Sequence, residues 1–317
     1  MRTNRIVTVL ILAVACCSML PAATQSKQAD ESIVRQTFDL AAPRTAEAQT
    51  YEMETKVITY APDGKRINTD TLKLWLKCKP GPAGKGTVPY TCEKFTVQFG
   101  SNPEAAVPSL ENWTYPFQGG AAGIDEKGQV FGIDHTKFDK LADAKGLPLP
   151  VDKAYFVYNT FIDFHSFCNV FAEPIPGGKG IQDLKRVGQK IVHAASFTEP
   201  PVNLGSNIAK GSAFKNGEVT LELKGVSIVD GVACAIVAFD SGQSSFQMII
   251  NPIPNMEVRT VGSSHYKGDL YIDLATRWVR KMTMDELVVT ETSVPMVPTK
   301  VCSVIERSST IRNTTAK

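Results

Sequence analysis

This sequence has almost no excess of positive or negative charge. Among its 317 residues, 34 are lysine or arginine and 32 are aspartate or glutamate. A chain without excess positive charge lacks the long-range attraction that holds polyanions, so nucleic-acid binding is disfavoured. The hydrophobic share of 43% is ordinary for a folded protein. The composition therefore predicts a globular chain with a packed core.

Long apolar runs are also lacking, apart from one near the start. The run from Ile6 to Leu20 is uncharged, and its 15 residues fall short of the roughly 20 that a membrane-spanning helix needs. Arg2 and Arg5 precede it and small residues follow, which is typical of a secretory signal peptide covering residues 1–23. We therefore expect an exported protein, periplasmic or extracellular, whose mature part has no transmembrane segment.

A lipid anchor is the alternative interpretation of the same leader. Residues 12–16 read LAVAC, which resembles a lipobox and would place a lipid on Cys16. Ala13 stands where a larger aliphatic residue is usual. We expect ordinary cleavage and keep lipidation of Cys16 as the second possibility.

Motifs for metal, cofactor and nucleophilic chemistry are scarce. The four histidines are dispersed, and the sequence holds no CxxC, HExxH or GxSxG pattern. The glycine-rich stretch 81–87 lacks the spacing of a phosphate-binding loop. We therefore expect no metal and no cofactor.

One catalytic candidate remains in the segment DFHSFC at 163–168. On a helix, His165 and Cys168 are three residues apart and neighbours, so the imidazole could activate the thiol. The alternative is a buried aromatic helix with one packed cysteine, and we favour it. The sequence therefore leans towards a protein that is not an enzyme.

The cysteines after the leader predict disulfides, because exported proteins fold in oxidising compartments. Cys78 and Cys92 flank a loop rich in proline and glycine between two strand-like runs, and closing a loop of about 15 residues contributes about 3 kcal/mol. Cys234 and Cys302 are a second expected pair between two strands. Cys168 would then remain a free thiol.

Alternation of apolar and polar residues predicts strands at both ends of the chain. It begins at Tyr51, continues through 66–78 and 93–99, and returns from about Phe214 in seven or eight segments. Asn-Gly at 216–217 and Asp-Gly at 230–231 indicate tight hairpins.

Helical spacing is confined to the middle of the sequence. It predicts helices over 135–145, 152–171 and 181–192, of which the second is rich in aromatic residues. Helices grouped between runs of strands indicate the α+β class. We expect a curved antiparallel β-sheet packed against a few helices, with an additional N-terminal β-sheet region. The expected division is 24–174 for that region with the central helices, and 175–317 for a helix followed by an antiparallel meander.

A family resemblance rests on the order of strands and turns over residues 214–290. With the segment GDLYIDLATRWVRKMTMDE at 268–286, this part of an exported chain resembles the LolA/LppX-type envelope proteins. The resemblance implies an unclosed barrel whose concave apolar face packs against helices and holds acyl chains. The chain departs from that pattern in its extra sheet region, 49–133.

The function expected from these features is non-catalytic binding of a lipid or another apolar ligand between sheet and helices. The expected lining residues are aromatic or aliphatic: Tyr155, Tyr158, Phe161, Ile162, Trp278 and Met282. The alternative for these side chains, and for the aromatic run at 113–117, is that they fill the core. An envelope interaction or scaffold protein, using sheet edges or the loop 80–90, is the alternative function. A thiol enzyme or hydrolase is less favoured.

Overall fold

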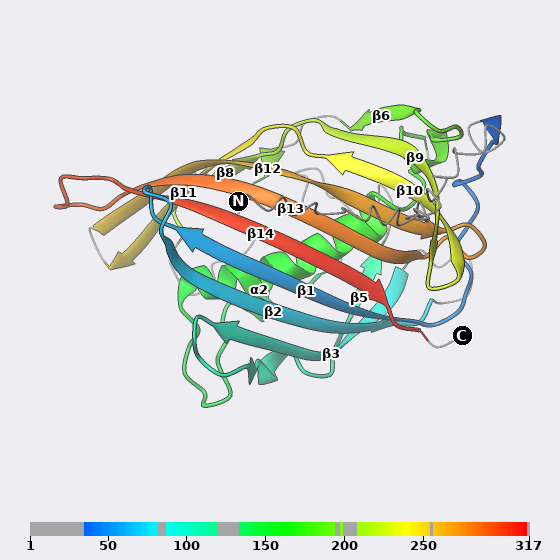
Figure 1. Ribbon diagram of the computed structural model, residues 1–317. Helices are drawn as coiled ribbons and strands as arrows, with labels where there is room; N and C mark the ends of the chain where they lie inside the picture. Colours follow the sequence, from blue (N-terminus) through cyan, green and yellow to red (C-terminus); the bar gives the residue numbers. More distant parts are fainter. Residues whose placement is uncertain are drawn as a thin grey trace, which may run out of the picture.

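The computed structural model of the chain describes residues 35–80, 87–118, 133–175, 177–193, 197–198, 208–253 and 256–315. The expected signal peptide, Cys16 and most of the loop 80–90 lie outside these residues. Within the described part, the strands form one antiparallel sheet that does not close on itself (Figure 1). Its strand order is β4-β3-β2-β1-β14-β13-β12-β10-β9-β6, while β11, β8, β7 and β5 pair beside this path.

The bounds of the fourteen strands follow the alternating segments of the sequence. They are β1 Gln49–Tyr60, β2 Arg66–Cys78, β3 Thr87–Phe99, β4 Ala105–Ala106, β5 Trp113–Gln118, β6 Lys190–His193, β7 Phe197–Thr198, β8 Ala213–Lys215, β9 Val219–Val229, β10 Val232–Asp240, β11 Ser244–Ile253, β12 Met256–Asp273, β13 Val279–Ser293 and β14 Val301–Asn313.

The first and last long strands are neighbours in the centre of the sheet. β1 pairs with β14 from Tyr51 opposite Asn313 to Tyr60 opposite Val304. Strands from both sides of the expected boundary at 174/175 therefore belong to one continuous sheet.

The described part contains a single α-helix. It is α2, Val151–His165, and it continues as a π-helical turn over Ser166–Val170. The helix expected over 152–171 is therefore present with a changed geometry in its last turn. The remaining helical pieces are short 3-10 turns: η1 Pro108–Leu110, η3 His135–Phe138 and η5 Ile181–Asp183. The α+β label accordingly fits only loosely, because the described chain is mostly antiparallel sheet.

Two of the expected helices are wrong in extent. The one at 135–145 is only the 3-10 turn η3, and the one at 181–192 is the turn η5 followed by strand β6. Gly188 separates η5 from β6 with a φ of +85°, a left-handed conformation that ends helical geometry. Its N–H donates to the carbonyl of Leu223 on β9, which places β6 at the sheet edge.

The core lies between α2 and the concave face of the sheet, which α2 crosses (Figure 1). Inward side chains alternate with outward ones along each strand, as a half-buried sheet requires. Met282 on β13 lies opposite Ile311 on β14, which lies opposite Met53 on β1, and all three are fully buried.

Two glycines in β12 allow the sheet to bend around this core. A Cβ on Gly268 would lie 1.8 Å from the Thr283 carbonyl oxygen and 2.7 Å from the Phe239 ring. A Cβ on Gly262 would lie 2.6 Å from the Phe246 ring. Aromatic rings that lie over strand glycines are a known device of curved sheets.

The expected disulfides are wrong, because all five described cysteines are free. Cys78 lies opposite Tyr90, and Cys92 lies opposite Leu76. The two cysteines are therefore diagonal neighbours, at a spacing of about 7–8 Å, which is too long for a disulfide. Cys234 is buried on β10 and Cys302 is exposed on β14, with β12 and β13 between them.

Candidate functional site

The N-terminal end of α2 is fixed to the sheet by a buried ion pair. Asp70 on β2 is fully buried, and its Oδ2 lies 2.5 Å from Nζ of Lys153. Its Oδ1 accepts hydrogen bonds from Nδ2 of Asn68 at 2.6 Å and from the Gly100 N–H at 3.0 Å. These bonds satisfy a carboxylate that would otherwise be costly to bury.

The aromatic side chains of α2 that were expected to line a ligand site pack mostly on other rings. Phe161 is fully buried and stacks on Phe95 at 5.6 Å, with Trp113 and Phe138 at 5.7 and 5.3 Å. Tyr158 contacts Phe138 at 5.3 Å. This part of the expected lining is core.

Tyr155 and Ile162 are only half-buried, and Tyr155 stacks on Phe214 of β8 at 6.1 Å. Phe214 in turn stacks on Phe246 of β11 at 5.6 Å. Tyr155 therefore begins a row of rings that leaves the core towards β11.

Trp278 lies away from that row, and Met282 is fully buried on β13 opposite Ile311. Trp278 donates from Nε1 to the Thr45 carbonyl at 3.0 Å, and the Arg44 guanidinium stacks on its ring at 4.5 Å. Arg44 contacts the carbonyl of Cys168, so Trp278 lies beside the C-terminal end of the helix whereas Tyr155 is in its first turns. The six expected lining residues thus do not form one surface.

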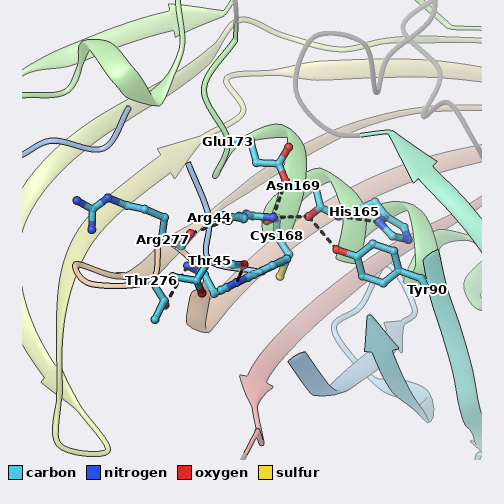
Figure 2. A network of polar contacts seen from close by, with 10 residues as sticks. Arg44, Thr45, Tyr90, His165, Cys168, Asn169, Glu173, Thr276 and Arg277 are labelled. Atoms are coloured by element: carbon cyan, nitrogen blue, oxygen red, sulfur yellow. Dashed lines mark hydrogen bonds and ion pairs between the residues drawn. The ribbon is translucent and has the colours of Figure 1, made fainter. Parts of the chain in front are cut away.

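A buried polar network surrounds this end of the helix (Figure 2). Nη1 of Arg44 donates to Oδ1 of Asn169 at 2.8 Å and pairs with Oε1 of Glu173 at 2.5 Å. Oδ1 of Asn169 also accepts from the Tyr90 hydroxyl at 3.1 Å. The same guanidinium reaches the Arg277 carbonyl with Nε at 3.3 Å. Arg44 therefore ties the chain before β1 to α2 and to the β12–β13 turn.

His165 completes the network and is fully buried. Its Nδ1 lies 2.8 Å from Nδ2 of Asn169, and its Nε2 lies 2.7 Å from Oη of Tyr115. Because Oδ1 of Asn169 faces donors, its Nδ2 must donate to Nδ1, which leaves the proton on Nε2. Burial lowers the pKa of His165 to about 3, so the ring is neutral at physiological pH.

The candidate thiol-enzyme arrangement at 163–168 does not form, and the segment is the buried aromatic helix with a packed cysteine that the sequence favours. Both nitrogens of His165 are bonded to Tyr115 and Asn169. The Cys168 thiol is buried, and burial raises its pKa, which disfavours the thiolate that a nucleophile needs. The π-helical turn places the Cys168 carbonyl towards Arg44 instead.

Asp163 belongs to a second charged cluster on the concave face. Arg307 on β14 pairs with Asp163, and its Nε lies 2.6 Å from Oε2 of Glu286 on β13. Two carboxylates thus share one guanidinium. Burial, with Glu286 nearby, raises the pKa of Asp163 to about 6 despite the attraction of Arg307.

Beyond the charged triad of Asp163, Glu286 and Arg307, the inward face of the sheet becomes accessible and mixes apolar side chains with hydroxyls, such as those of Thr290 and Ser303, which hydrogen-bond across β13 and β14 at 2.7 Å. Along β13, Met282 and Met284 are buried to 0 % and 1 % exposure, whereas Val288 is half-buried. The neighbouring inward positions share this half-burial: Ile305 on β14, Val258 on β12, and Phe246, Met248 and Ile250 on β11. We call these residues with Val288 the open lining.

Sequence reasoning missed Arg307 and Glu286, although a signal for them existed. Each occupies an inward position of an alternating strand, Arg307 between Ile305 and Ser309 and Glu286 between Met284 and Val288. A charged residue at an inward position requires a partner or a polar ligand. No comparable sequence pattern indicated that Arg44 and Asn169 belong to a buried polar network.

The described residues hold no group of three or more histidine, cysteine, aspartate or glutamate side chains that could bind a metal. Within them, too, no helix has the length and apolarity to cross a membrane.

No known protein family and no curated protein matches the sequence. Among solved structures, a triple mutant of the Rh. blastica porin is 9% identical, with 84% of this chain and 100% of that chain covered, at a TM-score of 0.21. Salmonella typhi OmpF in complex with daunomycin is 6% identical over 83% and 97%, at 0.20. The anion-selective porin from Comamonas acidovorans is 8% identical over 84% and 99%, at 0.18. Scores this low define neither a shared fold nor a shared function.

Proposed function

We propose that this chain is an exported, non-catalytic protein that binds a lipid-like ligand on the open lining of its concave face. The observation that carries the proposal is the open lining itself, six apolar side chains that face inward and are only half-buried. Each methylene of an acyl chain transferred from water onto such a surface gains about 0.8 kcal/mol. Small-molecule sites have this composition, apolar with a few polar groups at one end.

The charged triad supplies the polar groups. Arg307 and Glu286 face each other across β14 and β13, and the next inward pair along these strands is Ile305 and Val288 of the open lining. Together with Asp163 they carry one positive and up to two negative charges. This balance favours a ligand head group that is uncharged or cationic over one that would add a third carboxylate.

The resemblance of residues 214–290 to LolA/LppX-type envelope proteins supports the same proposal. In that pattern a concave apolar face and a helix hold acyl chains between them. Export through the leader at 1–23 belongs to the proposal as well.

A fluorescent probe titration tests the site. We expect the protein to bind a fluorescent monoacylglycerol more tightly than the matching fatty acid. Val288→Asn should weaken monoacylglycerol binding about tenfold or more, since it places an amide in the apolar lining. Val289→Asn is the matched control, because Val289 is exposed on the opposite face of the same strand.

Equal affinities of the two variants would overturn the location of the site. Failure of the unmodified protein to bind either probe would overturn ligand binding itself and favour the envelope interaction protein.

A further inference from the structure

Large exposed apolar side chains gather at one end of the sheet. Of the eleven found in the described residues, seven lie there, whereas Leu147, Val192, Ile228 and Leu287 lie elsewhere. The seven are Ile67, Ile253, Val261, Val289, Met296, Val297 and Val301. Scattered exposure needs no explanation, but a concentration of this kind marks an interaction surface.

Three hairpins form this end. Tyr60 at the β1–β2 hairpin lies opposite Val304 of β14, and Arg259, near the β11–β12 hairpin, lies opposite Ser293 at the end of β13. The β13–β14 hairpin and the neighbouring ends of β11 and β12 project beyond the rest of the sheet (Figure 1). We call the exposed apolar residues of these tips, Ile253, Met296, Val297 and Val301, the apolar tips.

The turn that presents Met296 shows that this exposure is built into the loop. The Val297 N–H donates to the Val294 carbonyl at 3.1 Å, Pro295 takes the second position, and Met296 takes the third with a φ of +66°. Proline followed by a positive φ defines a type II turn, whose third position normally holds glycine. Here a fully exposed methionine occupies it, in a backbone conformation that is unfavourable for a residue with a side chain.

Basic residues accompany the tips. Lys65 and Arg66 are exposed in the β1–β2 hairpin, and Lys300, which pairs with Glu291 of β13, is the only charged residue between Val294 and Val301. Apolar side chains at projecting points with lysine and arginine beside them match the interface of a lipid bilayer, where the apolar groups enter and the cations meet anionic headgroups.

We propose that the apolar tips dock this protein onto an anionic lipid surface. A protein partner is less well matched, because a stable protein interface needs about 800 Å² on each side with a continuous packed centre. The tips are instead separate points on two hairpins. The open lining lies on the same strands, so docking would bring its accessible end near the lipid. The inference does not depend on that ligand site, since the tips are exposed whether or not the lining is occupied.

Co-flotation with vesicles tests the proposal, using the full chain after export. We expect binding to vesicles of phosphatidylcholine with about 30% phosphatidylglycerol, and weaker binding to phosphatidylcholine alone. Met296→Gly should reduce the bound fraction severalfold and keep the turn intact, because glycine is the preferred residue there. Met296→Gly combined with Val297→Ser should abolish binding.

Ile228→Ser is the control, since Ile228 is also an exposed apolar residue but lies at the β9–β10 hairpin. It should bind vesicles like the unmodified protein. The proposal is overturned if the unmodified protein does not float with anionic vesicles, or if Met296→Gly floats as well as Ile228→Ser. It is also overturned if light scattering shows an oligomer that Met296→Gly converts to a monomer, because the tips would then join copies of this chain. Fluorescent probe binding without vesicles reports on the ligand site separately.

Discussion

Oη of Tyr115 on β5 lies 2.7 Å from Nε2 of His165 at the end of α2, and the imidazole is fully buried. The ring also stacks on Phe117 at 4.2 Å, two residues along the same strand. A neutral histidine therefore joins a strand at the edge of the sheet to the central helix. Its role in the described structure is to fix the position of the helix.

The pH dependence of stability should reveal this buried imidazole. The pKa of His165 is about 3 in the folded chain and 6.5 in the unfolded chain, so the unfolded state takes up the proton first as the pH falls. The contribution of His165 is complete above pH 6.5 and is lost progressively towards pH 3, at up to about 1.4 kcal/mol for each pH unit.

Urea denaturation of the unmodified protein and of His165→Gln, at intervals between pH 7 and pH 4, measures this effect. Glutamine does not titrate, so the free energy of unfolding of His165→Gln should fall less steeply. Parallel curves for the two proteins would show that His165 is not a buried neutral group.

Asn169→Leu should destabilise the fold by about 2–4 kcal/mol. The substitution leaves Nδ1 of His165 without its donor and removes one acceptor each from the Tyr90 hydroxyl and from Arg44. Chemical denaturation gives the loss of unfolding free energy. Asn102→Leu, at an exposed position, is the control and should change stability by about 0.5 kcal/mol or less. If Asn169→Leu lowers the free energy of unfolding as little as Asn102→Leu does, the polar network does not stabilise the fold.

Arg307→Met should be among the most destabilising single substitutions at neutral pH. It leaves Asp163 and Glu286 buried without their cation, which costs about 3–5 kcal/mol. The loss should shrink on going from pH 7 to pH 5, because protonation removes the uncompensated charge. Thermal unfolding at the two pH values measures this change. Arg259→Met, in an exposed ion pair with Glu257, should cost about 1 kcal/mol at most. An Arg307→Met loss that does not depend on pH would contradict the shared-guanidinium arrangement.

Thiol accessibility should separate one cysteine from the other four. Cys302 is exposed, whereas Cys78, Cys92, Cys168 and Cys234 are buried. Burial raises the pKa of Cys78 to about 11 and that of Cys92 to about 12, which slows their reaction further. Of these five thiols, one should react with Ellman's reagent in the folded protein and all five in urea without reductant. Loss of the fast reaction in Cys302→Ser identifies it. If fewer than five of these thiols react in urea, the remaining cysteines form a disulfide, and the prediction of five free thiols is wrong.

The sequence predicted strands well where one face of the sheet is buried, because burial imposes the alternation read from Tyr51 and from Phe214 onwards. It did not predict that β1 pairs with β14, since pairing between distant strands leaves no local pattern. The helix at 181–192 was wrong because apolar residues such as Ile181 and Leu184 fit a 3-10 turn as well as a helix. Gly188 then directs the chain into β6.

The site was predicted in part for similar reasons. The aromatic helix and the pair His165–Cys168 were visible as local spacing, but what they contact was not. Arg44, which determines the surroundings of Asn169, lies 125 residues away from it in the sequence. The disulfide prediction followed from the expected export and from loop composition, and strand register decided against it. Strand alternation contained one signal of the charged triad, namely a charged residue such as Arg307 at an inward position.

Native mass spectrometry of the protein purified from its own source tests the central claim most directly. We expect a complex heavier than the chain by the mass of a lipid-like molecule, which organic solvent releases, and Val288→Asn should carry much less of it than Val289→Asn. A chain that is repeatedly found at its own mass, and that binds neither acyl probe after purification, would contradict the account.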